Sequence, residues 1–424
     1  MIKICASIYN QLMTSKYFRN LFTLTTGVGL SQLVPLFLLP ILTRFFSPED
    51  FGLFALFLAI IQLLAICSTF RLEMAVVLPK KDTDAALLCF ISIIIMIIFL
   101  LLTFLLLYFY GSSIIQFPAI IHFHWFMYLI PVGAFFLAFY NILYSWNNRL
   151  ELYKKMSYSH VTHSLFSTPS SILLYFLNLK PIGLVLGQII GRAIACFVLF
   201  TNLLKTLKLI HRHQLFQNIS LLLKQYQKFI FFETPHAVLN FFSQKYIILF
   251  FTYFFTFSTV GVFDLADKII GKPLGIISNS FKTVFYKRLT TAKDKLTLFK
   301  RSIALTACIS FCLITPLYII PDSWFIVLLG SEWIDVGKYI KLICPLFFSK
   351  FVFNVVTPSV SYTLKNHYLL IWQIIYVVLL VLLFSRINSV DVEYILLTYS
   401  LFGAFMYICL GGISFVVLKN HIES

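Results

Sequence analysis

The chain has 424 residues, of which 60% are hydrophobic and 12% are charged, and it carries a net charge of +17. Soluble globular proteins contain about 25% charged residues, so this composition excludes a soluble fold, which would lack the polar surface to cover its core. Apolar stretches of about 20 residues recur along the chain, each long enough to cross the roughly 30 Å hydrocarbon layer of a membrane. A β-barrel is also excluded, because barrel strands alternate polar and apolar residues. The sequence predicts an all-α polytopic membrane protein.

Hydrophobicity places twelve transmembrane helices along the chain. The first apolar run is too long for the core of a signal peptide, so we expect it to remain as a span. The first six spans form an N-terminal bundle within residues 1–204, and the last six form a C-terminal bundle within residues 229–424. Residues 205–228 are a cytoplasmic linker. The expected spans are 20–43, 51–70, 85–110, 121–145, 158–178, 181–204, 229–252, 258–281, 302–320, 337–362, 367–385 and 394–418.

The basic residues orient these spans. If the N-terminus is cytoplasmic, 23 of the 33 Lys and Arg residues lie in inner segments, three lie in outer segments and seven lie within spans. This bias follows the positive-inside rule and predicts that both termini are cytoplasmic. It also explains the positive net charge without nucleic acid as a partner.

The two halves of the chain resemble each other weakly. Residues 47–56, with the sequence SPEDFGLFAL, align with residues 258–266, STVGVFDLA, so that Gly52 lies over Gly261. In each half this segment joins the first two spans. Parallel repeats of this kind are typical of transporters that rock one bundle against the other.

Charged residues deep within spans are the main candidates for a functional site, because a charge at the centre of a membrane helix costs about 2.5–3.5 kcal/mol. In span 258–281, three of them follow a spacing of four residues and share one helix face. Two interpretations stay open: salt bridges that only neutralise one another, or a cationic transit cavity for an anion. The excess of bases favours the cavity. The deep acids are Asp264 and Asp267, and the deep bases are Arg192, Lys245, Lys268, Lys272 and Lys350.

Other patterns in the sequence indicate no catalytic or metal site. The eight Cys residues are spread over spans and inner segments, and no Cys or His pair has the further ligands that a metal requires. No P-loop motif is present. The outer loops are too short to hold the active site of an enzyme, so we expect a protein that is not an enzyme and has no cofactor.

Four stretches carry a resemblance to a known family. The first inner loop reads RLEMAVVLPKKDTDA at residues 71–85, and the second inner loop reads YSWNNRLELYKKMS at residues 144–157. The first outer turn reads LPILTRFFSPEDFGLFAL at residues 39–56, and a late outer loop reads LLGSEW at residues 328–333. Together they resemble the Wzx-type oligosaccharide flippases of the multidrug/oligosaccharidyl-lipid/polysaccharide exporter superfamily.

The resemblance implies a MATE-like fold of two six-helix bundles related by a pseudo-two-fold axis, in the bacterial cytoplasmic (inner) membrane. Its substrate would be an undecaprenyl-diphosphate-linked oligosaccharide, which crosses from the inner to the outer leaflet, and other glycan-assembly membrane proteins are expected as partners. The deep bases would bind the diphosphate, while Asp264 and Asp267 would serve ion pairing or coupling to a proton gradient. The resemblance assigns Arg71, Glu73 and Arg149, in the two inner loops, to an inner gate.

Two other functions stay open. A cation-coupled multidrug exporter of the same fold would need an acidic or apolar cavity, and the excess of deep bases argues against it. A membrane-embedded glycan polymerase or glycosyltransferase would need a large outer loop, which the sequence lacks.

Overall fold

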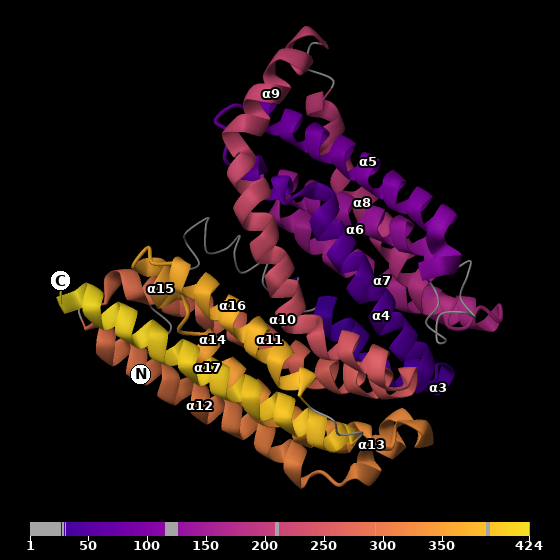
Figure 1. The fold of residues 1–424 in the computed structure, drawn as a ribbon, viewed down its shortest axis with the longest axis vertical. Helices are drawn as coiled ribbons and strands as arrows, with labels where there is room; N and C mark the ends of the chain where they lie inside the picture. The colour runs from indigo at the N-terminus through magenta and orange to yellow at the C-terminus, as the bar shows by residue number, and fades with distance from the viewer. Residues whose placement is uncertain are drawn as a thin grey trace. The chain divides into compact units, whose positions relative to one another are not determined.

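The computed structural model describes residues 27, 29, 31–114, 126–207, 212–292, 294–386 and 391–423. Every regular element in these ranges is a helix (Figure 1), which confirms the all-α class. Nine helical segments of the described chain are long and apolar enough to cross a membrane, and each coincides with a predicted span. The predicted spans 158–178 and 258–281 are also helical, but these helices are more polar than the other nine. The predicted first span, 20–43, lies mostly outside the described residues.

The chain divides into two compact units. The first comprises the described residues of Met1–Leu38 and Phe54–Phe241, and the second comprises Leu39–Leu53 and the described residues of Phe242–Ser424. The helix that begins after the first outer turn and the helix that follows residue 233 each continue from one unit into the other. The predicted bundles of residues 1–204 and 229–424 follow the repeat in the sequence, whereas these units follow packing.

The first unit is built from long helices joined by short helical turns. Helix α8 packs along both α6 and α7, and α5 packs against α6. Residues 212–228 of the predicted linker are helical and continue without a break through η4 into α10. The elements are α4 (Pro48–Thr69), η1 (Leu72–Val77), α5 (Asp82–Ile114), η3 (Phe126–Tyr128), α6 (Leu129–Arg149), α7 (Tyr153–Phe176), α8 (Ile182–Leu207), α9 (Arg212–Lys228), η4 (Phe229–Glu233) and α10 (Thr234–Phe254).

Glycines bring α7 and α8 close together. Helix α8 has Gly183, Gly187 and Gly191 on one face, and this stripe packs on the serine-rich side of α7. A Cβ atom on Gly191 would lie 2.7 Å from the carbonyl oxygen of His163. Small residues with this spacing allow membrane helices to pack backbone to backbone, so the stripe fixes which side chains of α7 and α8 face each other.

The second unit is arranged around α14 and α17, which pack on each other along much of their length, with α11 and α12 against α14. A cluster of buried apolar side chains, including Phe285, Phe299 and Leu418, ties α11, α12 and α17 together. The elements are α3 (Leu39–Phe45), α11 (Phe257–Thr291), α12 (Lys295–Ile319), α13 (Asp322–Leu329), η5 (Ser331–Trp333), α14 (Val336–Asn354), α15 (Pro358–Tyr362), α16 (His367–Ser385) and α17 (Val392–Glu423).

A capping box starts α4. The Asp50 carboxylate accepts a hydrogen bond from the backbone N–H of Ser47 at 2.9 Å, and the Ser47 hydroxyl accepts one from the N–H of Asp50 at 3.3 Å. Pro48, between them, occupies the first helical position, where a missing N–H costs nothing. The sequence SPED therefore sets the point at which the chain turns into α4.

The two aligned glycines lie at a reciprocal contact between the N-terminal turns of α4 and α11. A Cβ atom on Gly52 would lie 1.9 Å from the carbonyl oxygen of Phe257, and one on Gly261 would lie 1.8 Å from the carbonyl oxygen of Pro48. In the alignment of the halves, Pro48 corresponds to Phe257 as Gly52 does to Gly261. Gly52 of α4 thus contacts the first residue of α11, and Gly261 of α11 contacts the first residue of α4. A two-fold axis between the two helices produces such a reciprocal contact.

The late outer motif LLGSEW packs on the first outer turn. Trp333 is fully buried, and its indole N–H donates a hydrogen bond to the carbonyl oxygen of Thr43 at 3.1 Å. Its ring lies edge-on to Phe51, with centroids 5.0 Å apart. The Arg44 guanidinium donates to the carbonyl oxygen of Val327 at 2.6 Å. Two motifs that are almost 300 residues apart in sequence therefore pack against each other.

Candidate functional site

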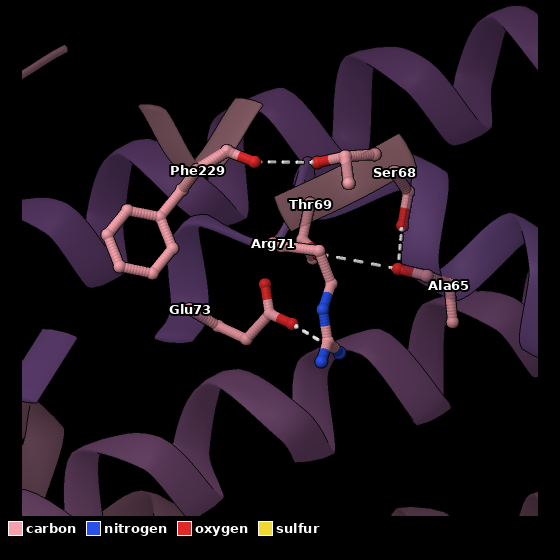
Figure 2. A network of polar contacts seen from close by, with 7 residues as sticks. Ala65, Ser68, Thr69, Arg71, Glu73 and Phe229 are labelled. Carbon is pink, nitrogen blue, oxygen red and sulfur yellow. Dashed lines mark hydrogen bonds and ion pairs between the residues drawn. The ribbon is translucent and has the colours of Figure 1, made fainter. Parts of the chain in front are cut away.

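The predicted inner-gate residues lie together in the first unit. Phe70 and Arg71, between α4 and η1, both have positive φ angles, of 46° and 57°. A left-handed conformation costs a non-glycine residue about 1–2 kcal/mol, and such strain persists only where the surroundings impose it. The turn directs Glu73 into the protein, where it is 2% exposed and pairs with Arg71 at 3.3 Å, as Figure 2 shows.

Arg149, at the end of α6, holds this loop from the other side. Its guanidinium donates to the Asp82 carboxylate at 2.9 Å and to the carbonyl oxygens of Val76 and Pro79 at 3.2 and 2.7 Å. These bonds span the loop from the end of η1 to the first turn of α5. The two inner loops that carry the family resemblance are therefore joined by one arginine, and the structure brings Arg149 to the same loop as Arg71 and Glu73.

A π-helical turn packs against this network. Helix η4 contacts η1, and the hydroxyl of Thr234 donates to the carbonyl oxygen of Phe229 at 3.1 Å across the turn (Figure 2). Burial raises the pKa of the Glu73 carboxyl above its ordinary value of 4.5; the Arg71 guanidinium opposes this rise and the negative charge of Glu233 adds to it. One carboxylate oxygen of Glu73 is buried without a hydrogen-bond partner. The network is therefore sensitive to the protonation of Glu73.

The charged stripe of α11 lies in the second unit. Asp264 is buried, with 2% of its surface exposed, and forms an ion pair with Lys268 one turn later, at 2.5 Å. Lys268 is 24% exposed, and Lys272, a further turn along, is exposed. Along this helix face, the ion pair of Asp264 and Lys268 is thus followed by the solvent-exposed side chain of Lys272. Asp264 and Lys268 therefore form the salt bridge that one of the two interpretations of the stripe predicts. Within the described chain, Lys272 has no such ion pair.

Further charges lie within electrostatic range of Lys272. They are Lys245 on α10 and Asp267 on α11, together with Asp264 and Lys268. Three ammonium groups and two carboxylates are therefore grouped around Lys272. With three bases and two acids, this place carries a net positive charge and can attract an anion.

Lys350 approaches the same helix from α14. Its ammonium group lies 5.7 Å from the centroid of the Phe347 ring. Phe347 in turn packs on α11, where a Cβ atom added to Gly271 would lie 3.0 Å from its ring. The ring of Phe347 is therefore a neighbour of both Lys350 and α11.

Arg192 has different surroundings, because it belongs to the first unit. Its guanidinium lies 4.7 Å from the centroid of the Tyr140 ring. His160 packs edge-on against Tyr140 and Tyr144, with centroids 5.8 and 5.3 Å away. From the sequence, His160 and His163 are interpreted as interfacial polar residues, and neither Tyr140 nor Tyr144 is predicted to belong to a site. Their grouping follows from the packing of three helices.

The fold is that of a known class of membrane transporter. An inward-facing structure of a multidrug resistance MATE family transporter of the MOP superfamily superposes with a TM-score of 0.67 at 13% identity, covering 95% of each chain. An outward-facing structure described in the same words superposes with a TM-score of 0.58 at 14% identity over 97% of each chain, and a MATE in complex with MaL6 does so with a TM-score of 0.61 at 11% identity over 98% of this chain and 99% of the other. These similarities establish the MATE-like fold.

The sequence establishes the family. The sequence model of the family described as "Polysaccharide biosynthesis protein" matches residues 41–338. The chain belongs to this polysaccharide biosynthesis family and has the MATE-like fold, so the predicted resemblance is confirmed at the level of family and fold. A search of curated protein sequences found no match. The family is one of polysaccharide biosynthesis, and the fold is that of multi-pass membrane transporters.

Proposed function

We propose that the protein translocates an undecaprenyl-diphosphate-linked oligosaccharide from the inner to the outer leaflet of the bacterial cytoplasmic membrane. The observation that carries the proposal is the stripe on α11, where Lys272 lies open next to the Asp264–Lys268 pair and within range of Lys245. A diphosphate carries about two negative charges, and ammonium groups in a membrane interior stabilise such a head group by charge-assisted hydrogen bonds.

In this proposal Lys245, Lys268, Lys272 and Lys350 receive the diphosphate, while the lipid tail stays in the bilayer. The sugar crosses within the protein as the two six-helix bundles, joined by residues 205–228, alternate between two arrangements. Transport requires no covalent chemistry. A multidrug exporter of organic cations would need the opposite charge at this place.

Coupling and gating complete the proposed cycle. Asp264 and Asp267 are the carboxylates that would take up a proton if transport is coupled to a proton gradient. Arg71, Glu73 and Arg149 would form the gate on the cytoplasmic side, where both termini lie in the predicted orientation. Other membrane proteins of glycan assembly would deliver and receive the substrate.

The experiment is complementation in the source organism. Deletion of the gene should remove surface glycan and cause lipid-linked oligosaccharide to accumulate, as measured by mass spectrometry of the lipid extract. Lys272→Gln should fail to restore surface glycan at normal protein level, because the open ammonium group is lost. Lys300→Gln, which removes an exposed lysine at the start of α12, is the matched control and should restore it. Restoration by both variants would contradict the assignment of Lys272.

A further inference from the structure

Three polar side chains of the first unit lie around the ring of Tyr140, and the described part of the chain offers their polar groups no hydrogen bond. Arg192 is the eleventh residue of α8, about 15 Å from the start of the helix at 1.5 Å per residue, which is near the middle of a 30 Å hydrocarbon layer. Tyr144 comes from α6 and His160 from α7. Within the described chain, no hydrogen-bond acceptor or carboxylate pairs with the Arg192 guanidinium, which lies over the ring of Tyr140.

The cluster has a fixed geometry. The Tyr140 hydroxyl is engaged by Ser159 at 3.0 Å, so Tyr140 is anchored and acts on Arg192 through its ring face. Tyr144 lies 5.9 Å from Tyr140, with the rings inclined by 32°. His160 lies across the edges of both rings, and the charge of Arg192 acts on it. The glycine stripe of α8 holds α7 close, one turn from His160.

These groups match the chemistry of a sugar ring that carries an acid. A planar aromatic ring accepts the apolar face of a pyranose, as it accepts other apolar surfaces, while a phenol and an imidazole exchange hydrogen bonds with hydroxyl groups. The guanidinium presents a fork of donors that fits a carboxylate in a bidentate manner. A charged arginine without a partner acid is costly at this depth, so an anionic ligand would supply the missing acceptor.

We propose that Tyr140, Tyr144, His160 and Arg192 form a recognition subsite for a sugar of the repeat unit that carries a carboxylate, separate from the lysines that receive the diphosphate. This inference rests on the proposed function and deepens it, since it names the residues that select the glycan. Arg192 then acts in the selection of the glycan, whereas Lys272 acts on the head group that every lipid-linked substrate shares.

The test measures the binding of two probes to the full-length protein in lipid nanodiscs. One probe is a short polyprenyl diphosphate that carries glucuronic acid, and the other carries glucose. The wild type should bind the glucuronic acid probe about 10- to 100-fold more tightly, the range expected for charge-assisted hydrogen bonds to one carboxylate. Arg192→Gln should remove this preference and keep the affinity for the glucose probe. Arg192→Lys should keep part of it, because the charge remains without the fork.

Two control variants distinguish the carboxylate subsite from the diphosphate site and from non-specific effects of removing a charge. Lys272→Gln should weaken both probes by the same factor, and Arg288→Gln, at an exposed position near the end of α11, should weaken neither. Equal affinity of the wild type for both probes would overturn the subsite alone. An equal loss of affinity for both probes in Arg192→Gln would also overturn it, because that result would place the diphosphate at Arg192. No binding of either probe by the wild type would overturn the proposed function, and the subsite with it.

Discussion

The ion pair of Asp264 and Lys268 allows the two interpretations of the α11 stripe to be separated. Asp264 is 2% exposed and Lys268 is 24% exposed. Lys268→Gln would leave the Asp264 carboxylate buried without its counter-charge, and breaking a buried pair in this way costs about 3–5 kcal/mol. The double variant Asp264→Asn with Lys268→Gln removes both charges and leaves two amides that can hydrogen-bond, so its cost should be about 1 kcal/mol or less.

The assay has two parts. The thermal stability of detergent-purified protein should fall clearly for Lys268→Gln and return close to that of the wild type in the double variant. Surface glycan should be lost in both, because both lack the ammonium group at position 268. A double variant that is stable and also restores normal glycan would refute the transport role of Lys268 and reduce the pair to a structural salt bridge. A double variant as unstable as the single one would refute the energetic reasoning from burial.

Three further predictions concern packing, pH and the outer motif. Gly261→Ala should destabilise the protein by about 1–3 kcal/mol, since the added Cβ would lie 1.8 Å from a backbone oxygen of α4, whereas Gly275→Ala on the same helix, with nothing within 4 Å, should be neutral or slightly stabilising in thermal unfolding. Burial raises the pKa of Glu73 above 4.5, so the folded state holds this proton more tightly than the unfolded state, and the contribution of Glu73 to stability falls as pH rises from 4.5 to its raised pKa. The melting temperature of Glu73→Gln relative to the wild type should therefore increase over that range, and a constant difference would contradict the burial argument. Trp333→Phe should cost about 1–3 kcal/mol in unfolding free energy, because the Thr43 carbonyl loses its 3.1 Å donor; an unchanged melting temperature would show that this bond contributes nothing.

Hydrophobicity and spacing were sufficient to predict the long helices of the described chain and the common face of Asp264, Lys268 and Lys272 on α11, because both depend on residues close in sequence. The end of α11 was not predictable in the same way. The predicted span ends at residue 281, but the helix continues to Thr291, since hydropathy locates the membrane and not the end of a helix. The ion pair between Asp264 and Lys268 follows directly from their i, i+4 spacing.

The grouping of Tyr140, His160 and Arg192 could not be predicted, since it depends on how α6, α7 and α8 pack. The glycine spacing of α8 is visible in the sequence, but it does not say which helix it meets. The burial of Glu73 could not be predicted either. The motif places Glu73 in an inner loop, but only the left-handed turn at Arg71 shows that its carboxylate points into the protein. Contacts distant in sequence thus define both groups.

The most direct test of the account asks on which side of the membrane the lipid-linked oligosaccharide lies. Spheroplasts of the deletion strain, carrying the wild-type gene or Lys272→Gln, are treated with membrane-impermeant periodate, which oxidises the sugars that face outward, and the lipid extract is analysed by mass spectrometry. If the protein moves the lipid outward, the wild type should give oxidised lipid-linked oligosaccharide, whereas Lys272→Gln and the strain without the gene should give intact, protected oligosaccharide. Equal oxidation in all three strains would show that the lipid crosses without this protein and would contradict the central claim.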